Sequence, residues 1–156
     1  MALHYEIIIK ANPETVWNIM LGKDTYPKWT AIFKEGSYFE GDWSQGSEMR
    51  FLGPDEEGKI GGMLSRIIEC IPNQSIKLEH YGMINDGVVV TDAEEIKMWA
   101  PAYENYYLSK IDGGTDLRVE MKMNESFDDY FNETWPLALV HLRDLCEAEA
   151  NKSQES

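Results

Sequence analysis

The sequence predicts an α+β fold in which one long C-terminal helix covers a curved antiparallel sheet of about six to seven strands. Three observations carry this prediction. A strand and two short helices come first, alternating apolar and polar residues fill most of residues 36–123, and apolar residues at helical spacing fill residues 126–150. With 156 residues, of which 43% are hydrophobic, the chain can form a single domain over residues 1–150. The polar residues 151–156 are expected to form a disordered tail.

The first element is an isoleucine-rich strand over residues 3–10, and a helix start follows at residues 12–14. An Asn at the cap accepts hydrogen bonds from the first helical N–H groups, Pro is tolerated at the first helical position, and Glu in the first turn favours the helix dipole. Gly22 is the expected end of this helix. A second short helix or turn is expected over residues 26–33.

From Gly36 onward the period changes from helical to alternating, with glycine, proline and asparagine at the turns. The alternation is clearest near the end, where Leu117 and Val119 face one way while Arg118 and Glu120 face the other. One face of the sheet is therefore expected to be buried and the other solvated. The predicted strands are residues 37–43, 47–53, 59–71, 75–85, 103–112 and 115–123.

The alternation stops between Gly87 and Ala102. The run at residues 91–95 can cap a short helix, and a lid loop fits this segment equally well. Trp99 in this segment, like Trp29 in the earlier irregular region, is a candidate to cover the opening of a cavity.

The C-terminal helix is the most regular feature of the sequence. Its apolar residues recur at three- and four-residue spacing, while acidic residues dominate the opposite face. About twenty-four residues at ~1.5 Å per residue span roughly 36 Å, enough to cross the whole sheet. Pro136 is expected to kink the helix or divide it, because proline removes a backbone donor inside a helix. The apolar stripe consists of Phe127, Phe131, Trp135, Leu139, Leu142 and Cys146.

The charge and the cysteines limit the class of function. A formal net charge of −14 disfavours nucleic acids and anionic membrane surfaces as partners, since both require clustered Lys and Arg. No stretch reaches the ~18 apolar residues of a membrane span, so no membrane insertion is expected. Cys70 and Cys146 lie far apart without the spacing of a redox motif, which predicts two free thiols in a reducing compartment. The expected localisation is cytoplasmic.

The order of elements and several short motifs resemble a known superfamily. Residues 9–17, with the sequence IKANPETVW, resemble the opening run of the START-like (SRPBCC) superfamily. Within it the chain resembles the AHSA-like branch, which is related to the activator of the heat-shock-protein-90 ATPase. The resemblance covers residues 3–149 and implies the START-like helix-grip fold. Further landmarks lie at residues 41–43, 46–51, 79–82, 104–106, 114–117 and 135–142.

The resemblance implies a deep cavity between the long helix and the concave side of the sheet. Members of the superfamily bind lipids, hormones, polyketides or other hydrophobic molecules, and some are cyclases. An empty cavity of ~300 Å³ would cost on the order of 7 kcal/mol, so a ligand, water or bulky side chains should occupy it. Aromatic and methionine side chains that face the cavity can either line it or fill it. The candidate ligand contacts are Trp29, Phe51, His80, Trp99, Glu104, Tyr106, Met121, Phe131 and Trp135.

His80 is expected on the inward face of its strand with Ile76 and Leu78. A buried imidazole needs a hydrogen-bond partner, which Glu104 or Tyr106 on a later strand can supply. It can be a structural histidine, or a polar anchor that orients an apolar ligand and titrates near neutrality. A third interpretation is catalysis by His80 with Glu104 as its carboxylate.

Three functions are therefore open: binding of a hydrophobic or amphipathic small molecule, a protein-interaction module for a basic partner, and a cyclase- or hydrolase-type enzyme that uses His80 and Glu104. The second follows from the similarity to the co-chaperone branch. The sequence has no phosphate-binding, metal-binding or hydrolase motif, so no cofactor, metal ligand or catalytic residue is assigned. A binding protein is favoured over an enzyme, as a monomer or weak dimer.

Overall fold

A computed structural model describes residues 2–155 of the chain, except for the side chains of residues 153–155. The elements in chain order are β1 (Leu3–Ile9), α1 (Pro13–Leu21), α2 (Tyr26–Thr30), β2 (Tyr38–Glu40), β3 (Glu48–Pro54), β4 (Ile60–Ile71), β5 (Ser75–Asn85), β6 (Val88–Val90), α3 (Glu94–Lys97), β7 (Ala102–Ile111), β8 (Gly114–Lys122), the 3-10 helix η1 (Glu125–Phe127) and α4 (Asp128–Glu155).

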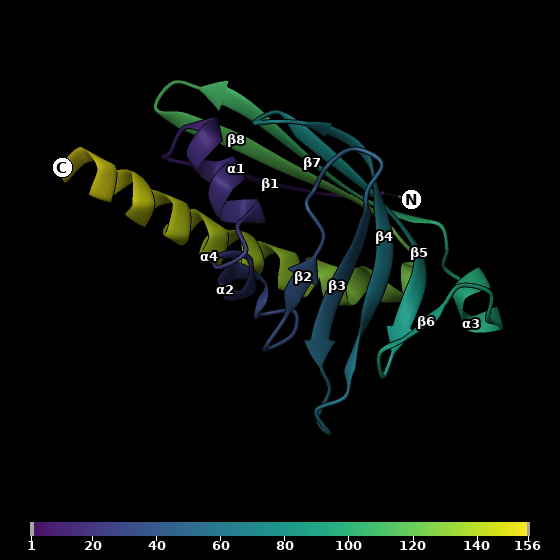
Figure 1. Ribbon diagram of the computed structural model, residues 1–156. Coiled ribbons are helices and arrows are strands. Elements are labelled where there is room, and N and C mark those ends of the chain that lie inside the picture. The colour runs from purple at the N-terminus through teal and green to yellow at the C-terminus, as the bar shows by residue number, and fades with distance from the viewer. Residues whose placement is uncertain (1, 156) are drawn as a thin grey trace.

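The strands form one antiparallel sheet that curves around α4 (Figure 1). The order across the sheet is β1-β8-β7-β5-β4-β3-β2, and β6 pairs with β5. The helices α1 and α2 both pack against α4. The predicted architecture is confirmed, with eight strands among the described residues instead of six to seven. The additional strand is β6, whose three valines lie where the alternation stops and are too few to reveal a period.

The local signals around α1 act as the sequence predicts. The Asn12 side-chain oxygen accepts a hydrogen bond from the Thr15 N–H at 2.8 Å, and the helix ends directly before Gly22. For residues 87–102 the sequence allows either a short helix or a lid loop. The structure has a short helix there, α3, which forms one turn and packs against β5. Ile96 anchors that turn with only 2% of its surface exposed.

The sheet bends in the part of β3, β4 and β5 that extends beyond the hydrophobic core. An irregularity in the β4–β5 pairing makes Tyr81 an extra residue after His80, so Met83 lines the concave side although it is out of phase with His80. Gly62 on β4 allows a close approach, because a Cβ at this position would lie 1.8 Å from the Phe51 carbonyl oxygen.

The helix α4 runs unbroken to Glu155 with Pro136 inside it, so division of the helix at Pro136, one of the two expected outcomes, is wrong. The expected disordered tail also needs correction. Residues 151–155 continue the helix, because no glycine or proline ends it. Ser156, the last residue of that tail, lies outside the described residues.

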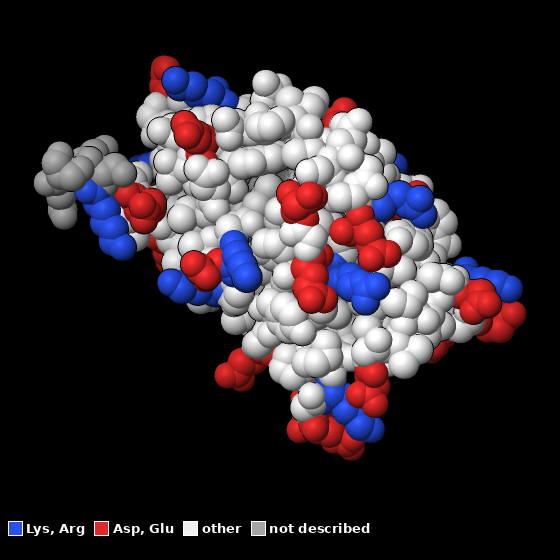
Figure 2. Space-filling view, in the orientation of Figure 1, with Lys and Arg blue, Asp and Glu red and all other residues white. Residues whose placement is uncertain are grey.

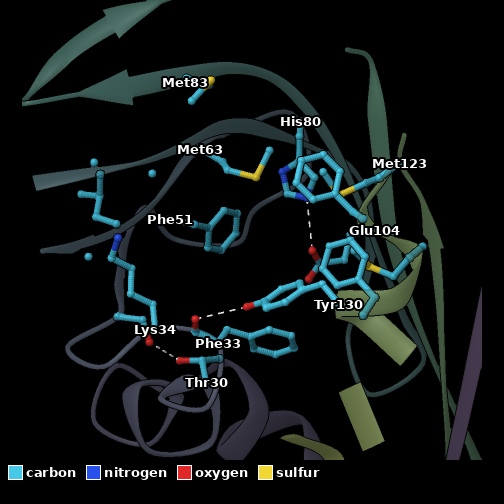
Figure 3. A pocket seen from close by; sticks show the side chains of 18 of the residues that line it. Thr30, Phe33, Lys34, Phe51, Met63, His80, Met83, Glu104, Met123 and Tyr130 are labelled. Atoms are coloured by element: carbon cyan, nitrogen blue, oxygen red, sulfur yellow. Dashed lines mark hydrogen bonds and ion pairs between the residues drawn. The ribbon is translucent and has the colours of Figure 1, made fainter. Parts of the chain in front are cut away.

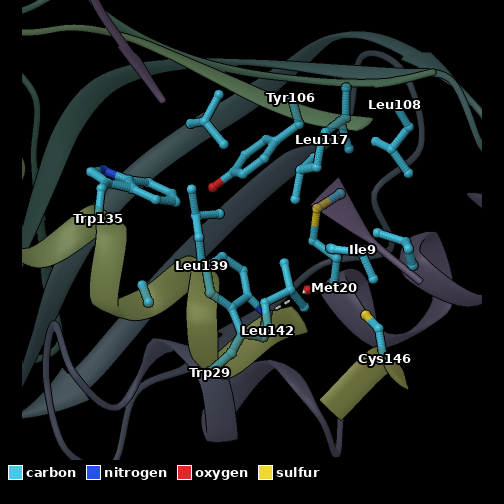
Figure 4. Packing of buried hydrophobic residues seen from close by; sticks show 14 of the residues in the cluster. Ile9, Met20, Trp29, Tyr106, Leu108, Leu117, Trp135, Leu139, Leu142 and Cys146 are labelled. Carbon is cyan, nitrogen blue, oxygen red and sulfur yellow. Dashed lines mark hydrogen bonds between the residues drawn. The ribbon is translucent and has the colours of Figure 1, made fainter. Parts of the chain in front are cut away.

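The hydrophobic core lies between α4, α1 and the strands β1 and β8 (Figure 4). Leu142 and Cys146 on α4 are fully buried in it. The indole N–H of Trp29 donates to the Met20 carbonyl at 3.0 Å, which ties α2 to α1. Phe127, expected on the buried stripe of the long helix, is instead 39% exposed because it belongs to η1.

Candidate functional site

A pocket of about 550 Å³ lies beneath the N-terminal half of α4 (Figure 3). Its other walls come from α2 and the residues after it, from β3, β4 and β5, and from one end of β7 and β8. All nine residues that the sequence suggested as ligand contacts line this pocket, and their contact with a ligand stays a prediction. They are Trp29, Phe51, His80, Trp99, Glu104, Tyr106, Met121, Phe131 and Trp135.

Sequence reasoning missed other residues of the lining. Met63 and Met83 are paired across β4 and β5, and both face the pocket. The irregularity between these strands hides Met83 from any alternation pattern. Tyr26 was within reach of prediction, since it precedes Trp29 by three residues and therefore shares a face of the short helix α2 with it. The rings of Tyr26 and Phe51 lie 6.1 Å apart between centroids.

A row of hydrogen-bonded polar groups crosses the wall of the pocket. Ser65 Oγ lies 2.5 Å from His80 Nδ1. On the other side of the ring, His80 Nε2 lies 3.2 Å from Glu104 Oε1 (Figure 3). The Tyr106 hydroxyl donates to Glu104 Oε2. The strand register explains the row, because Ser65 pairs with His80 across β4 and β5. Both ring nitrogens of His80 are therefore occupied by protein groups, and the expected partnership of His80 with Glu104 is present.

Two tyrosine hydroxyls near Glu104 are held in the protonated form. Burial raises the pKa of Tyr26, and the nearby charge of Glu104 raises it further. The pKa of Tyr106 is also raised, first by burial and then by Glu104. Because a protonated phenol can donate a hydrogen bond, both groups are donors at neutral pH.

The serine of the row is not placed for nucleophilic attack on a molecule in the pocket. Ser65 is fully buried and is not among the residues that line the pocket, so its hydroxyl orients His80 and cannot meet a substrate there. Among the described residues, no group of three or more His, Cys, Asp or Glu side chains is arranged to hold a metal ion.

A contact between α4 and the segment after α2 forms part of the pocket wall. The Tyr130 hydroxyl donates to the Phe33 carbonyl at 3.2 Å, and the two rings lie 6.4 Å apart between centroids (Figure 3). Lys34 follows directly, lines the pocket and is exposed to solvent. Trp99, expected at the opening, belongs to the same lining.

Comparison of the whole sequence with protein families gives one assignment. The family described as "Activator of Hsp90 ATPase homolog 1-like protein" matches residues 10–147. The chain belongs to this family. The resemblance drawn from residues 9–17 is thereby confirmed. No curated protein matches the chain.

Solved structures similar to this AHSA1-like chain share its fold at low sequence identity. Protein MLL2253 from Mesorhizobium loti is 14% identical with a TM-score of 0.70, over 95% of this chain and 98% of that one. Protein CV1439 from Chromobacterium violaceum is 19% identical with a TM-score of 0.69, over 94% and 96%. The Aha1 dimer from Colwellia psychrerythraea, a solution structure, has the same identity, coverage and TM-score. At these identities the likeness establishes the fold alone.

The surface of this AHSA1-like chain mixes charges of both signs. Figure 2 shows acidic and basic side chains interspersed over the visible face, including the projecting turn between β3 and β4. In that turn Lys59 forms an ion pair with Glu57 at 3.2 Å. Among residues 2–155, no helix has the length and apolar character needed to cross a membrane.

Proposed function

We propose that this AHSA1-like chain binds a mainly apolar small molecule in the pocket beneath α4. The observation that carries the proposal is the pocket itself, which has about 550 Å³ and a lining that is largely aromatic, aliphatic or methionine. Ligand pockets in proteins commonly have ~300–1,000 Å³ and this mixture of apolar walls with a few polar groups. Apolar walls in contact with water are unfavourable by ~25 cal/mol per Å², so an apolar molecule that covers them gains free energy.

The row of Ser65, His80 and Glu104 supports the same function. A buried polar row in an apolar wall is costly unless it is fully hydrogen-bonded or serves a purpose. Here it gives the pocket a polar end, which would orient a ligand that carries one polar group. The ligand is therefore amphipathic, with most of its surface apolar.

Titration with Nile red, a neutral apolar fluorophore, tests the proposal. We expect a saturable increase in fluorescence at one dye per chain. Substitution of Met63→Trp or Met83→Trp fills the pocket and should weaken dye binding at least tenfold. The control is Ile68→Trp on β4, where the side chain is 43% exposed, and it should bind the dye like the wild type. Absence of saturable binding, or equal binding by the filled and control variants, would overturn the proposal.

Family membership favours a second candidate, an interaction with another protein. The family description names an activator of the Hsp90 ATPase, and the net charge of −14 suits a partner with a basic surface. Pull-down from native lysate at low and high salt tests it. A partner retained at low salt and lost at high salt supports this function, and the absence of any partner at either salt concentration excludes it.

A further inference from the structure

The Glu104 carboxylate stands out among the groups in the pocket wall. It is the only acidic side chain among the described residues of the lining, and 20% of its side chain is exposed. Carboxylates are rarely placed in apolar surroundings unless they are paired or have a function. The hydrogen bonds that Glu104 makes within the protein determine which of its lone pairs remain available to a ligand.

Each oxygen of Glu104 accepts one hydrogen bond from the protein. Oε1 accepts from His80 Nε2 at 3.2 Å, and Oε2 accepts from the Tyr106 hydroxyl. A carboxylate has about four lone-pair positions, so roughly two remain. Figure 3 shows the carboxyl group directed into the pocket. His80 has no nitrogen to offer, because Ser65 occupies Nδ1.

The surroundings favour a ligand group that donates hydrogen bonds. Aromatic rings line the same pocket, among them Tyr26, Tyr106 and Trp135, and the faces of such rings attract cations and disfavour anions. The Tyr26 hydroxyl hydrogen-bonds to no described residue and, as a protonated phenol near Glu104, can serve a ligand hydroxyl, but a neutral donor does not offset the negative charge of Glu104. The net charge of −14 acts in the same direction on any charged ligand.

We propose that the ligand's polar end is a hydrogen-bond donor, an ammonium or a hydroxyl group, that Glu104 accepts, and that anionic ends are excluded from the pocket. This inference rests on the binding function proposed above. An ammonium group donates to Glu104 alone. A hydroxyl group donates to Glu104 and can also accept from Tyr26. A carboxylate or sulfonate meets the charge of Glu104 with no compensating donor on His80.

Lys34 carries a positive charge and would favour a ligand with an anionic end, which is the opposite of the preference expected from Glu104. It is the only lysine or arginine among the described lining residues, and no described carboxylate forms an ion pair with it. Lys34 is exposed to solvent, and water screens charges more strongly there than inside the pocket. For this reason we expect Glu104 to dominate selection of the polar end.

The experiment compares three ligands with one apolar body: naphthalen-2-ylmethylammonium, naphthalen-2-ylmethanol and naphthalene-2-carboxylate. Isothermal titration calorimetry on the full chain should show the ammonium and the alcohol binding at least tenfold tighter than the carboxylate. In Glu104→Gln, the preference for ammonium over carboxylate should shrink at least tenfold. In Glu40→Gln, which changes the net charge equally at an exposed position, it should change less than twofold. Glu104→Asp keeps the charge and should keep the exclusion of the carboxylate.

Equal binding of all three compounds by the wild type overturns this inference and leaves the proposed function standing. Tighter binding of the carboxylate, lost in Lys34→Gln, also overturns it and moves the polar end to Lys34. If the preference for ammonium over carboxylate changes equally in Glu104→Gln and Glu40→Gln, the preference comes from net charge and not from Glu104. Failure of every compound and of Nile red to bind overturns the proposed function itself.

Discussion

The two halves of α4 cover the same sheet but enclose different interiors. The part of α4 that follows Pro136 places Leu139, Leu142 and Cys146 into a core, where each residue is 2% exposed or less (Figure 4). The N-terminal half lies over the pocket, where Tyr130 is 43% exposed and Phe131 is only partly buried. We call these regions the filled end and the open end.

The difference comes from what faces the helix. At the filled end, α1 and β1 approach α4 and supply Met20 and Ile9, both fully buried. At the open end, the sheet bends where β4 carries Gly62 and β5 has an extra residue. Large rings there contact one another around the space, as Phe33 and Trp135 do with centroids 4.9 Å apart. One amphipathic helix can thus cover both a packed core and a pocket. The spacing of its apolar residues alone therefore does not specify what lies beneath it.

The largest contrast is expected from large-to-small substitution. Leu142→Ala at the filled end should lower the free energy of unfolding by about 3 kcal/mol, because it leaves a closed cavity among residues that cannot all relax. Phe131→Ala at the open end removes more atoms but leaves no closed cavity, and should cost about 1 kcal/mol or less. Urea unfolding at equilibrium measures both. Equal losses would mean that the pocket is packed as tightly as the core.

Small-to-large substitution should give the reverse contrast. Met20→Phe overpacks the filled end and should destabilise by about 2 kcal/mol. Met63→Phe, the same change in the lining, should alter the free energy of unfolding by less than about 0.5 kcal/mol, because the added ring carbons extend into the pocket. Thermal and urea unfolding of the matched pair provide the measurement. A penalty for Met63→Phe as large as that for Met20→Phe would contradict an open end.

The filled end is easier to predict from the sequence than the open end. The filled end follows from periodicity, since Leu117 and Val119 alternate and Leu139 and Leu142 recur at helical spacing, and all four are buried. The open end depends on irregularities that periodicity does not encode. The extra residue after His80 brings Met83 into the lining, and no periodic pattern in the sequence predicts this extra residue.

The polar row was predictable in part. The alternating pattern predicts that His80 faces inward, with Glu104 as a possible partner. In the structure the two side chains are hydrogen-bonded. The role of Ser65 was out of reach, because it depends on the register between β4 and β5 at the irregularity. This unpredicted hydrogen bond occupies the second nitrogen of His80, so the hydrogen-bonding capacity that remains in the row lies on Glu104.

Alkaline pH should act on the filled end through Cys146. Burial, and secondarily the charge of Glu147, raises its pKa from 9.0 to about 12. Between these values the unfolded thiol ionises while the folded thiol keeps its proton, so the free energy of unfolding falls as pH rises, by at most ~1.4 kcal/mol per pH unit. Below the unfolded value both states are protonated, and Cys146 makes no contribution that depends on pH.

The measurement for Cys146 is urea unfolding at about pH 8 and about pH 10, where the wild type should lose about 1 kcal/mol more than Cys146→Ala. Other groups titrate in this range, so only the difference between the two proteins reports on the thiol. Burial raises the pKa of Cys70 as well, but this thiol is less buried than Cys146, so Cys70→Ala should lose a smaller part of the wild-type dependence than Cys146→Ala. A Cys146→Ala variant with the wild-type dependence would indicate a thiol that water reaches, in conflict with a filled end.

The smallest contrast between the two regions is expected at Pro136, which lies in α4 at the boundary between the filled end and the open end. Its side chain is exposed, next to Trp135 of the pocket and close to Leu139 of the core. Pro136→Ala restores a backbone N–H that can donate to the carbonyl of residue 132, and it should raise the free energy of unfolding, since a proline inside a helix costs up to ~3 kcal/mol.

The readouts that separate the two ends in Pro136→Ala are amide hydrogen exchange and Nile red affinity. Exchange at Leu142 should be unchanged relative to global stability, because the core around it is already closed. Nile red affinity should change at least threefold, because a stiffer helix repositions Trp135 and Phe131 over the pocket. Leu137→Ala, at a side chain 53% exposed, is the matched control and should leave both readouts unaltered. If Pro136→Ala changes exchange at Leu142 as much as dye affinity, the two ends respond as one packed unit, and the contrast between them does not extend to their dynamics.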